Sequence, residues 1–205
     1  MTFYEELKTK YGINKPILLR DITYKGYSQA WIYKQLCSLC EEGRLIKFDK
    51  GVYYIPQNTV LGTSRLNPID VIEKKYVETD NEIIGYYSGT AFLNQIGIST
   101  QVPNLIEIYT NNESSRVRDV KVGRQQVRLR KTRVSVTNKN AATLALLEMM
   151  NSSQARQLDK KQREMCEQFI RKNGIKRSDI IEYSKYFPDS VMRNLIESEV
   201  IFCVV

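Results

Sequence analysis

The pattern of apolar and polar positions between residues 26 and 56 predicts a helix that leads directly into a tight hairpin. Ser28 is a favourable helix cap, and Gly43 ends the helical pattern. The apolar residues between them recur at helical spacing: Ile32, Leu36, Leu39 and Cys40. Two short apolar runs follow, at 44–48 and 52–55, joined by a turn sequence. A capped helix followed by a basic hairpin is typical of a winged helix–turn–helix, which has a recognition helix and a wing.

The outer side of this helix would face the major groove of DNA, with base contacts concentrated near Ser28 and Gln29. Lys47 and Lys50 of the hairpin are placed to contact phosphates, which set affinity more than sequence choice. The predicted DNA-binding residues are Lys25, Tyr27, Ser28, Gln29, Trp31, Lys34, Lys47 and Lys50. The alternative is a helix–hairpin unit that is used only for protein contacts.

The flanking sequence predicts further elements of the N-terminal region. Thr2 and Glu5 have the spacing of a capping box for a helix over 2–11. The apolar run at 17–22 fits a short helix. Residues 57–67 show little periodicity and are rich in turn formers, so we expect a domain boundary there.

Beyond the boundary, helices and strands alternate. We expect a helix from Pro68 to Tyr76 capped by Asn67, a Ser88-capped helix ending at Gly97, and a buried strand over 105–110. Strands with period two follow, at 117–122 and 127–134, and we expect Asn140 to cap an apolar helix over 141–150. Three helices are expected at about 155–172, 176–186 (capped by Ser178) and 189–199, with an apolar tail that docks on the body. The predicted fold class is α+β, with domains at 1–60, 64–152 and 153–205.

Charge changes this picture because it is unevenly distributed. The chain has a formal net charge of +8 and a pI near 9.2, which favours an anionic partner. Residues 113–139 carry nine Lys or Arg against two Asp or Glu, a local net charge of +7. The cations proposed as a basic patch for DNA or a protein partner are Arg116, Arg118, Lys121, Arg124, Arg128, Arg130 and Arg133. A solvated edge strand is the alternative, but such a concentration of charge favours a second nucleic-acid or acidic-partner surface.

The sequence gives little support for a catalytic site or a metal site. The chain has no histidine, which removes Ser-His and Cys-His nucleophiles and histidine-containing metal sites. Cys37 and Cys40 have a zinc-like spacing, but they fit better as packing residues, because a closed site needs four ligands. We therefore expect no catalytic residues, no metal and no cofactor, and the four cysteines point to reduced thiols.

One enzyme class stays as an alternative, a magnesium-dependent nuclease subunit. Its carboxylates would come from the acidic middle segment: Asp70, Glu73, Glu82 and Glu107. Such sites need a lysine two residues after the strand carboxylate, where this chain has Tyr109. Since neither a secretory signal nor an apolar run of about 18 residues is visible, we expect a cytoplasmic protein without a membrane partner.

Two blocks of the sequence resemble the AbiEi-type antitoxin family. The hairpin run from Gly43 to Tyr53 resembles that family's N-terminal winged helix. The block Tyr86-Tyr87-Ser88-Gly89-Thr90-Ala91-Phe92-Leu93, the strand over 106–110 and the apolar helix over 140–150 look like its second domain. The resemblance covers roughly residues 1–150, and the order of the two blocks is more specific than either alone.

The resemblance implies the antitoxin of a bacterial toxin–antitoxin (abortive infection) system that also binds operator repeats and represses its own operon. It implies a cognate toxin with a nucleotidyltransferase fold, and in several such systems the pair acts without stable contact. The competing hypothesis is an interaction protein that neutralises its toxin by direct contact, through residues 116–133 or the C-terminal helices. Operator sequence, toxin identity and oligomeric state stay open.

Overall fold

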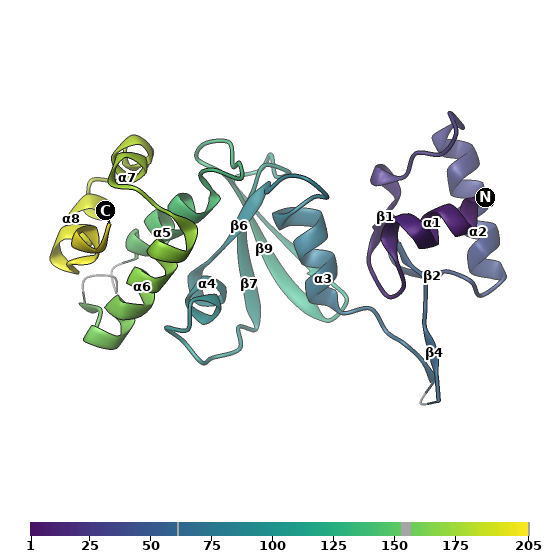
Figure 1. Ribbon diagram of the computed structural model, residues 1–205, viewed down its shortest axis with the longest axis horizontal. Coiled ribbons are helices and arrows are strands. Elements are labelled where there is room, and N and C mark those ends of the chain that lie inside the picture. Colours follow the sequence, from purple (N-terminus) through teal and green to yellow (C-terminus); the bar gives the residue numbers. More distant parts are fainter. Residues whose placement is uncertain (61, 153–156, 205) are drawn as a thin grey trace. The chain divides into compact units, whose positions relative to one another are not determined.

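The computed structural model describes residues 1–60, 62–152 and 157–204 (Figure 1). The chain divides into two compact units: unit 1 comprises Met1–Lys75 and Val122–Arg124, and unit 2 comprises Tyr76–Lys121 and Gln125–Val205. Both contain helices and strands, which confirms the predicted α+β class. Within the described ranges, none of the helices is both long enough and apolar enough to span a bilayer.

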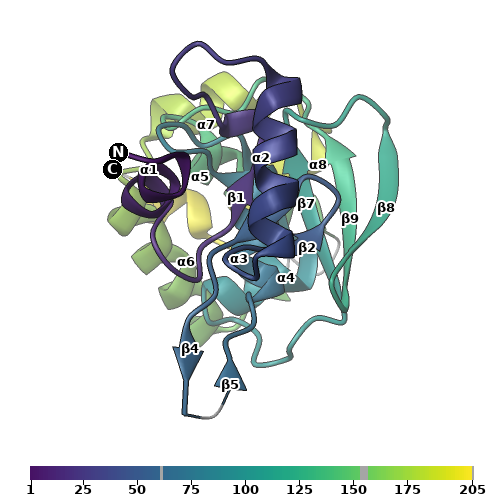
Figure 2. The ribbon, with the colours of Figure 1, turned by 90° about the vertical axis from the view of Figure 1, so that its right-hand side faces the viewer.

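Unit 1 places a helix against a small sheet. Its elements in chain order are α1 (Phe3–Tyr11), β1 (Ile17–Leu18), the 3-10 turn η1 (Leu19–Asp21), α2 (Gln29–Glu41), β2 (Ile46–Asp49) and β3 (Val52–Tyr54). The strands form an antiparallel sheet in the order β1-β3-β2. Figure 2 shows α2 along the near side of this unit.

Local signals explain the two helices of unit 1, and both were predicted. The Thr2 side chain accepts a hydrogen bond from the Glu5 N–H, and the Glu5 carboxylate accepts one from the Thr2 N–H, so the capping box is confirmed. The Ser28 hydroxyl accepts a hydrogen bond from the Trp31 N–H and caps α2. The apolar stripes of both helices meet the sheet in one core: Phe3, Leu7, Ile17, Ile22, Tyr24, Ile32, Leu36, Leu39, Leu45, Tyr53 and Ile55.

The short helix expected at 17–22 is wrong. Ile17 and Leu18 form a strand that pairs with Tyr53 and Val52 of β3, and only Leu19–Asp21 form a single 3-10 turn. A run of three apolar residues has no period that separates strand from helix. The partner strand, 35 residues further along the chain, decided the outcome, because pairing satisfies the backbone of two fully buried residues.

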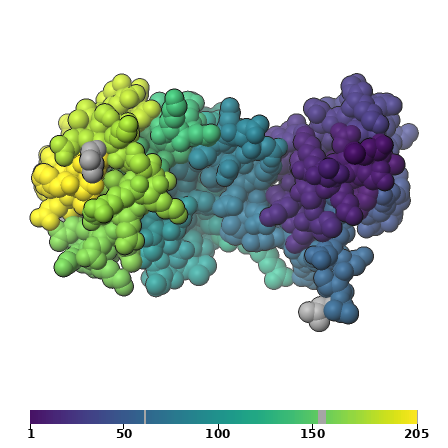
Figure 3. All heavy atoms as spheres, viewed as in Figure 1, coloured from purple at the N-terminus to yellow at the C-terminus, as the bar shows by residue number. Residues whose placement is uncertain are grey.

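The segment at 57–67, where a domain boundary was expected, contains a two-stranded ribbon. Strands β4 (Asn58–Thr59) and β5 (Gly62–Thr63) pair antiparallel, and the ribbon stands out from unit 1 (Figures 1 and 3). Its base is held by Ser64, whose carbonyl accepts a hydrogen bond from the Tyr54 hydroxyl and whose own hydroxyl donates to the Asn14 side chain. Helix α3 (Pro68–Ile72) follows, capped by Asn67 as predicted, and continues as the π-helical turn η2 (Glu73–Val77).

Unit 2 is built on a four-stranded mixed sheet. Its strands are β6 (Gly85–Ser88), β7 (Leu105–Thr110), β8 (Val117–Val122) and β9 (Gln125–Lys131), in the order β6-β7-β9-β8. Strand β6 pairs antiparallel with β7, whereas β9 pairs parallel to β7. Helix α4 (Gly89–Gln95) follows β6 directly. The second basic strand was predicted over 127–134, but it begins at Gln125 and ends at Lys131.

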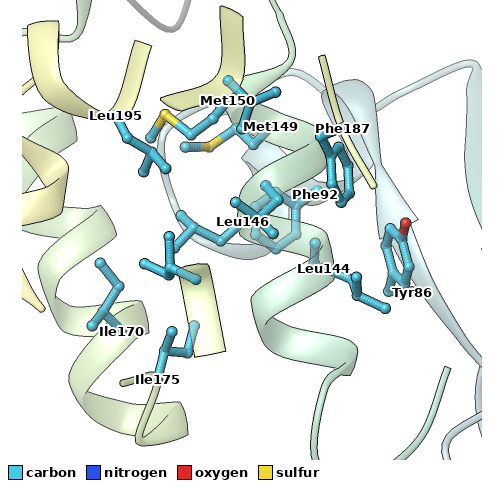
Figure 4. Packing of buried hydrophobic residues seen from close by; sticks show 14 of the residues in the cluster. Tyr86, Phe92, Leu144, Leu146, Met149, Met150, Ile170, Ile175, Phe187 and Leu195 are labelled. Carbon is cyan, nitrogen blue, oxygen red and sulfur yellow. The ribbon is translucent and has the colours of Figure 1, made fainter. Parts of the chain in front are cut away.

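Helix α5 (Ala141–Met150) forms the centre of the unit 2 core. The helices that follow it are α6 (Lys160–Asn173), α7 (Arg177–Ser184), α8 (Ser190–Glu197) and the 3-10 turn η4 (Val200–Cys203). Their buried residues pack in the same cluster as α5 and the sheet residue Tyr86 (Figure 4). The region predicted as a C-terminal extension thus shares a core with the sheet. The predicted start of its first helix at Ala155 lies outside the described residues.

Three of the predicted helix caps differ in detail. Ser88 lies at the N-cap of α4 but makes no capping hydrogen bond. The Asn140 side chain accepts from the Thr137 N–H and donates to the Ser135 carbonyl, so it stabilises the preceding turn instead of α5. Helix α7 begins after Lys176, which places Ser178 inside the first turn.

Candidate nucleic-acid interface

Unit 1 has a groove between the start of α2, the turn η1 and the β2–β3 hairpin. Its floor is apolar and includes Leu18, Leu19 and Val52. Around the floor lie four cations and two polar side chains, namely Arg20, Lys47, Lys50, Lys75, Gln29 and Tyr33. None of the described residues that line this groove is acidic. Positive charge therefore surrounds an apolar floor in one concave place. Such a concentration of positive charge attracts a polyanionic ligand.

The hairpin explains why two lysines reach the groove. Lys47 is exposed on β2, opposite Tyr53 of β3. At the turn, the Asp49 carboxylate accepts a hydrogen bond of 2.7 Å from the Lys50 N–H, and Gly51 closes the turn with φ of 70°. The carboxylate is therefore engaged with the backbone, and the Lys50 side chain stays exposed. Neither lysine forms an ion pair with any residue that the structure describes. Arg20, in contrast, pairs with Asp21 at 3.5 Å.

The start of α2 carries the residues predicted to read bases. The Ser28 hydroxyl is engaged as the helix cap, at 3.3 Å from the Trp31 nitrogen. The Gln29 side-chain amide donates to the Ile22 carbonyl at 3.1 Å. Both side chains are therefore held by the protein itself, although both residues are exposed. Lys34, one turn further along α2, is also exposed.

Trp31 lies in different surroundings from those predicted. It was expected on the outer side of α2, but its ring is half-buried in an aromatic cluster with Phe3, Tyr24 and Tyr27. Lys25 lies beside the cluster, with its ammonium 4.8 Å from the centre of the Tyr24 ring, and interaction with the Tyr24 side chain raises the pKa of Lys25. Trp31 therefore supports the start of the helix more than it projects from it.

Three hydrophilic residues that line the groove were missing from the predicted set: Tyr33, Arg20 and Lys75. Tyr33 is 47% exposed and lies four residues after Gln29, so helical spacing alone places both on one face. That signal was available in the sequence. Arg20 could not be placed in this way, because its segment was expected to be helical.

The basic strands, β8 and β9, carry most of the predicted basic patch, and most of its arginines are paired. Four short contacts join arginine and carboxylate groups: Arg118–Glu113 (2.7 Å), Arg128–Asp119 (2.8 Å), Arg130–Glu107 (3.0 Å) and Arg133–Glu148 (3.3 Å). The parallel register of β7 and β9 places Glu107 directly opposite Arg128 and next to Arg130. Two of these carboxylates, Glu107 and Glu148, come from outside residues 113–139 and therefore offset part of the local charge.

Two carboxylates of this network, Asp119 and Glu113, have a lowered pKa. The two hydrogen bonds from the Arg128 guanidinium lower the pKa of Asp119. Burial by itself would raise the pKa of Glu113, but hydrogen bonds from the Ser115 N–H and from Arg118 more than offset it and hold this pKa below its usual value. These ion pairs are therefore intact at neutral pH.

Glu148 is also largely buried, with 8% of its side chain exposed, against 2% for Glu113. It accepts hydrogen bonds from the Tyr109 hydroxyl and the Asn151 amide in addition to its contact with Arg133. Burial, followed by the negative charge of Glu148, raises the pKa of Tyr109 to about 12. This part of the network ties β7 to α5 and is structural.

Three of the predicted patch residues keep their charge exposed. Arg116, Lys121 and Arg124 form no ion pair with the part of the chain that the structure describes, and all three are exposed. Arg116 and Lys121 lie before and within β8, and Arg124 lies in the turn that leads to β9. They are the residues of this segment that a partner could reach.

The alternatives with a metal ion gain no geometric basis. Cys37, Cys40, Cys166 and Cys203 are free thiols. Among the described residues, no three Cys, Asp or Glu side chains gather as they would around a metal ion. Glu107, the strand carboxylate of the nuclease hypothesis, lies against Arg128 and Arg130.

The chain was compared with curated proteins and with models of protein families. A comparison with curated proteins finds no match. The model of one protein family, described as a family of unknown function (DUF6088), matches residues 8–177. The match includes the groove residues on α2 and the hairpin, as well as both basic strands. The chain therefore belongs to the DUF6088 family.

Proposed function

We propose that the protein binds double-stranded DNA through unit 1, which would act as a winged helix–turn–helix with α2 as recognition helix and the β2–β3 turn as wing. The observation that carries the proposal is the groove, where Lys47 and Lys50 are exposed, unpaired among the described residues and unopposed by any acidic lining residue. A duplex supplies one negative charge per about 1.7 Å of its axis, so such a surface attracts it strongly.

The arrangement of elements supports this assignment. The order α1-β1-η1-α2-β2-β3, with a sheet ordered β1-β3-β2, puts a helix beside a hairpin whose turn carries Lys50. A helix fits the major groove, while the hairpin can reach the neighbouring backbone. The second helix of a usual helix–turn–helix is reduced here to the single turn η1.

Each residue then has a distinct role. Lys47 and Lys50 contact phosphates and set affinity without sequence preference. Lys34 contacts the bases or the adjacent DNA backbone. The Gln29 side chain does the same with the hydrogen-bonding atoms that its contact to Ile22 leaves available. Tyr33 contacts a phosphate through its hydroxyl or packs on the sugar, because it lines the same groove as the lysines.

The biological role that we propose is that of an antitoxin that represses its own operon. The resemblance to AbiEi-type antitoxins supports it, together with the DNA-binding geometry proposed for unit 1. The cognate toxin would be a nucleotidyltransferase-fold protein encoded by the neighbouring gene.

The test is binding to a duplex from the region upstream of its own gene, measured by fluorescence anisotropy over a range of salt concentrations. Replacing Lys47 and Lys50 by Ala should weaken binding roughly tenfold and reduce the slope of log affinity against log salt by about two. The matched control replaces two exposed lysines of α6, Lys161 and Lys172. Equal affinities for both double variants and the wild type would contradict the proposal.

A second candidate function is favoured by one observation, the exposed cations Arg116, Lys121 and Arg124. They would contact an acidic surface of the toxin, and neutralisation would then be direct. Co-purification with the neighbouring gene product tests this. Loss of neutralisation in the triple Ala variant, with operator binding retained, would support direct contact.

A further inference from the structure

The start of α2 carries three aromatic rings that lie almost parallel. The Tyr27 and Trp31 rings are 4.1 Å apart between centres, at 20°. The Tyr24 ring lies 5.5 Å from that of Trp31, at 2°, and 5.7 Å from that of Tyr27, at 17°. Phe3 closes the inner edge of the cluster with edge-on contacts to Tyr24 and Trp31. Such contacts hold each ring in a fixed orientation.

Tyr27 is the exposed member of this cluster. Tyr27 is 51% exposed, whereas Tyr24 is only 7% exposed. The Tyr27 ring therefore has one face covered by the cluster and one face open. A tight turn holds it there: the Tyr27 N–H donates to the Tyr24 carbonyl at 2.7 Å across Lys25 and Gly26, both at positive φ. Lys25 has φ of 44°, which is unfavourable for a residue other than glycine. The fold therefore accepts strain to hold this ring in place.

Next to Tyr27, two hydrogen-bonding side chains are already engaged within the protein. The Ser28 hydroxyl caps the helix, and the Gln29 amide donates to the Ile22 carbonyl. The neighbouring exposed residue on the helix is Ala30, which offers only a methyl group. The first turn of α2 thus presents an aromatic face and a methyl group where base contacts of a recognition helix concentrate.

We propose that Tyr27, supported by Trp31 and flanked by Ala30, recognises the 5-methyl group of thymine in the major groove. The inference rests on the proposed function, because it assumes that α2 enters that groove. The methyl group is the apolar feature by which thymine differs from cytosine there, and apolar side chains contact it in preference to hydrogen-bonding ones. A ring already held by stacking loses little freedom on binding. Lys25, two residues before Tyr27 in the chain, would contact the adjacent phosphate.

The experiment uses the duplex bound by the full-length protein and replaces each thymine in turn by deoxyuridine, which removes only the methyl group. Loss of one buried methyl group corresponds to about a fourfold change in affinity. For the wild type and Tyr27→Phe, which keeps the ring, we expect such a loss at one or two positions. For Tyr27→Ala we expect that replacing thymine by deoxyuridine at those positions causes no further loss of affinity. Tyr33→Ala, a matched control at an exposed tyrosine within α2, should bind more weakly but keep the deoxyuridine sensitivity.

The outcomes separate this inference from the proposed function. If the wild type binds the duplex with the expected salt dependence but is insensitive to deoxyuridine, or if Tyr27→Ala keeps the sensitivity, the thymine contact is overturned and DNA binding stands. Tighter binding to single strands than to the duplex would indicate stacking on an unpaired base, and would also overturn it. If the wild type binds no duplex at all, both proposals fall. Because the change is made in the DNA, a folding defect cannot imitate the expected result.

Discussion

The groove of unit 1 and the basic strands β8 and β9 show how differently two basic regions of one chain can be used. Residues 113–139 carry a local charge of +7, but Arg118, Arg128, Arg130 and Arg133 are held by carboxylates. Residues 1–57 carry only nine Lys or Arg against six Asp or Glu, yet Lys47 and Lys50 stay exposed in a groove without acidic lining. The density of charge along a sequence is therefore a poor guide to the charge that a partner meets.

The physical cause of the difference is strand register. Parallel pairing of β7 with β9 puts Glu107 opposite Arg128, and β8 contributes Asp119 to the same arginine. In the hairpin of unit 1 the one nearby carboxylate, Asp49, is engaged with the backbone of its own turn. Like charges along a strand are tolerated where opposite charges lie across from them, and that arrangement cancels their long-range field.

The largest expected effect comes from removing Glu148, which would leave Arg133, the Tyr109 hydroxyl and the Asn151 amide without this partner. Glu148→Ala should lower the free energy of unfolding of unit 2 by roughly 3 kcal/mol. Trp31 is the only tryptophan, so its fluorescence reports on unit 1, while circular dichroism reports on both units. In urea we expect the dichroism transition to move to lower concentration, with DNA affinity at low urea retained. Glu164→Ala, at an exposed glutamate of α6, is the control.

The next effect compares charge reversal in the two regions directly. Lys47→Glu with Lys50→Glu should lower duplex affinity about a hundredfold, because two attractive contacts become repulsive ones. Arg116→Glu with Lys121→Glu makes the same change of net charge in the basic strands. We expect a loss of less than about threefold from it, through long-range field alone. Equal losses in a binding titration at 0.15 M salt would show that both regions contact DNA.

A smaller effect is expected from Glu113→Gln, which removes the charge that Arg118 contacts at 2.7 Å. We expect a loss of roughly 1.5 kcal/mol in the free energy of unfolding at pH 7. Because the pKa of Glu113 is lowered in the folded protein, its stabilising contribution is complete above the unfolded value of about 4.3 and is lost as the pH falls through the folded value. The difference between the wild type and the variant in urea titrations should therefore narrow as the pH is lowered below about 4.3. A difference that does not narrow would place the effect in packing rather than in charge.

Much of unit 1 could be predicted from sequence because its signals are local. The capping box of Thr2 and Glu5, the Ser28 cap and the turn at Gly51 each act within a few residues. The face that Tyr33 shares with Gln29 was equally accessible from helical spacing, although it was overlooked. Two cations of the candidate groove, Arg20 and Lys75, needed the fold to place them.

By itself, then, the sequence determined where most helices and strands lie, since caps, turn residues and apolar periodicity act over a few residues. The tertiary structure alone decided that Ile17 and Leu18 form a strand, that the Trp31 ring packs with Phe3, and which arginines of residues 116–133 remain free. Those outcomes depend on partners that are distant along the chain, such as β3 for Ile17 and Glu148 for Arg133. No local pattern records which of many distant residues will come to lie within hydrogen-bonding distance, because that choice is made by the packing of the whole unit.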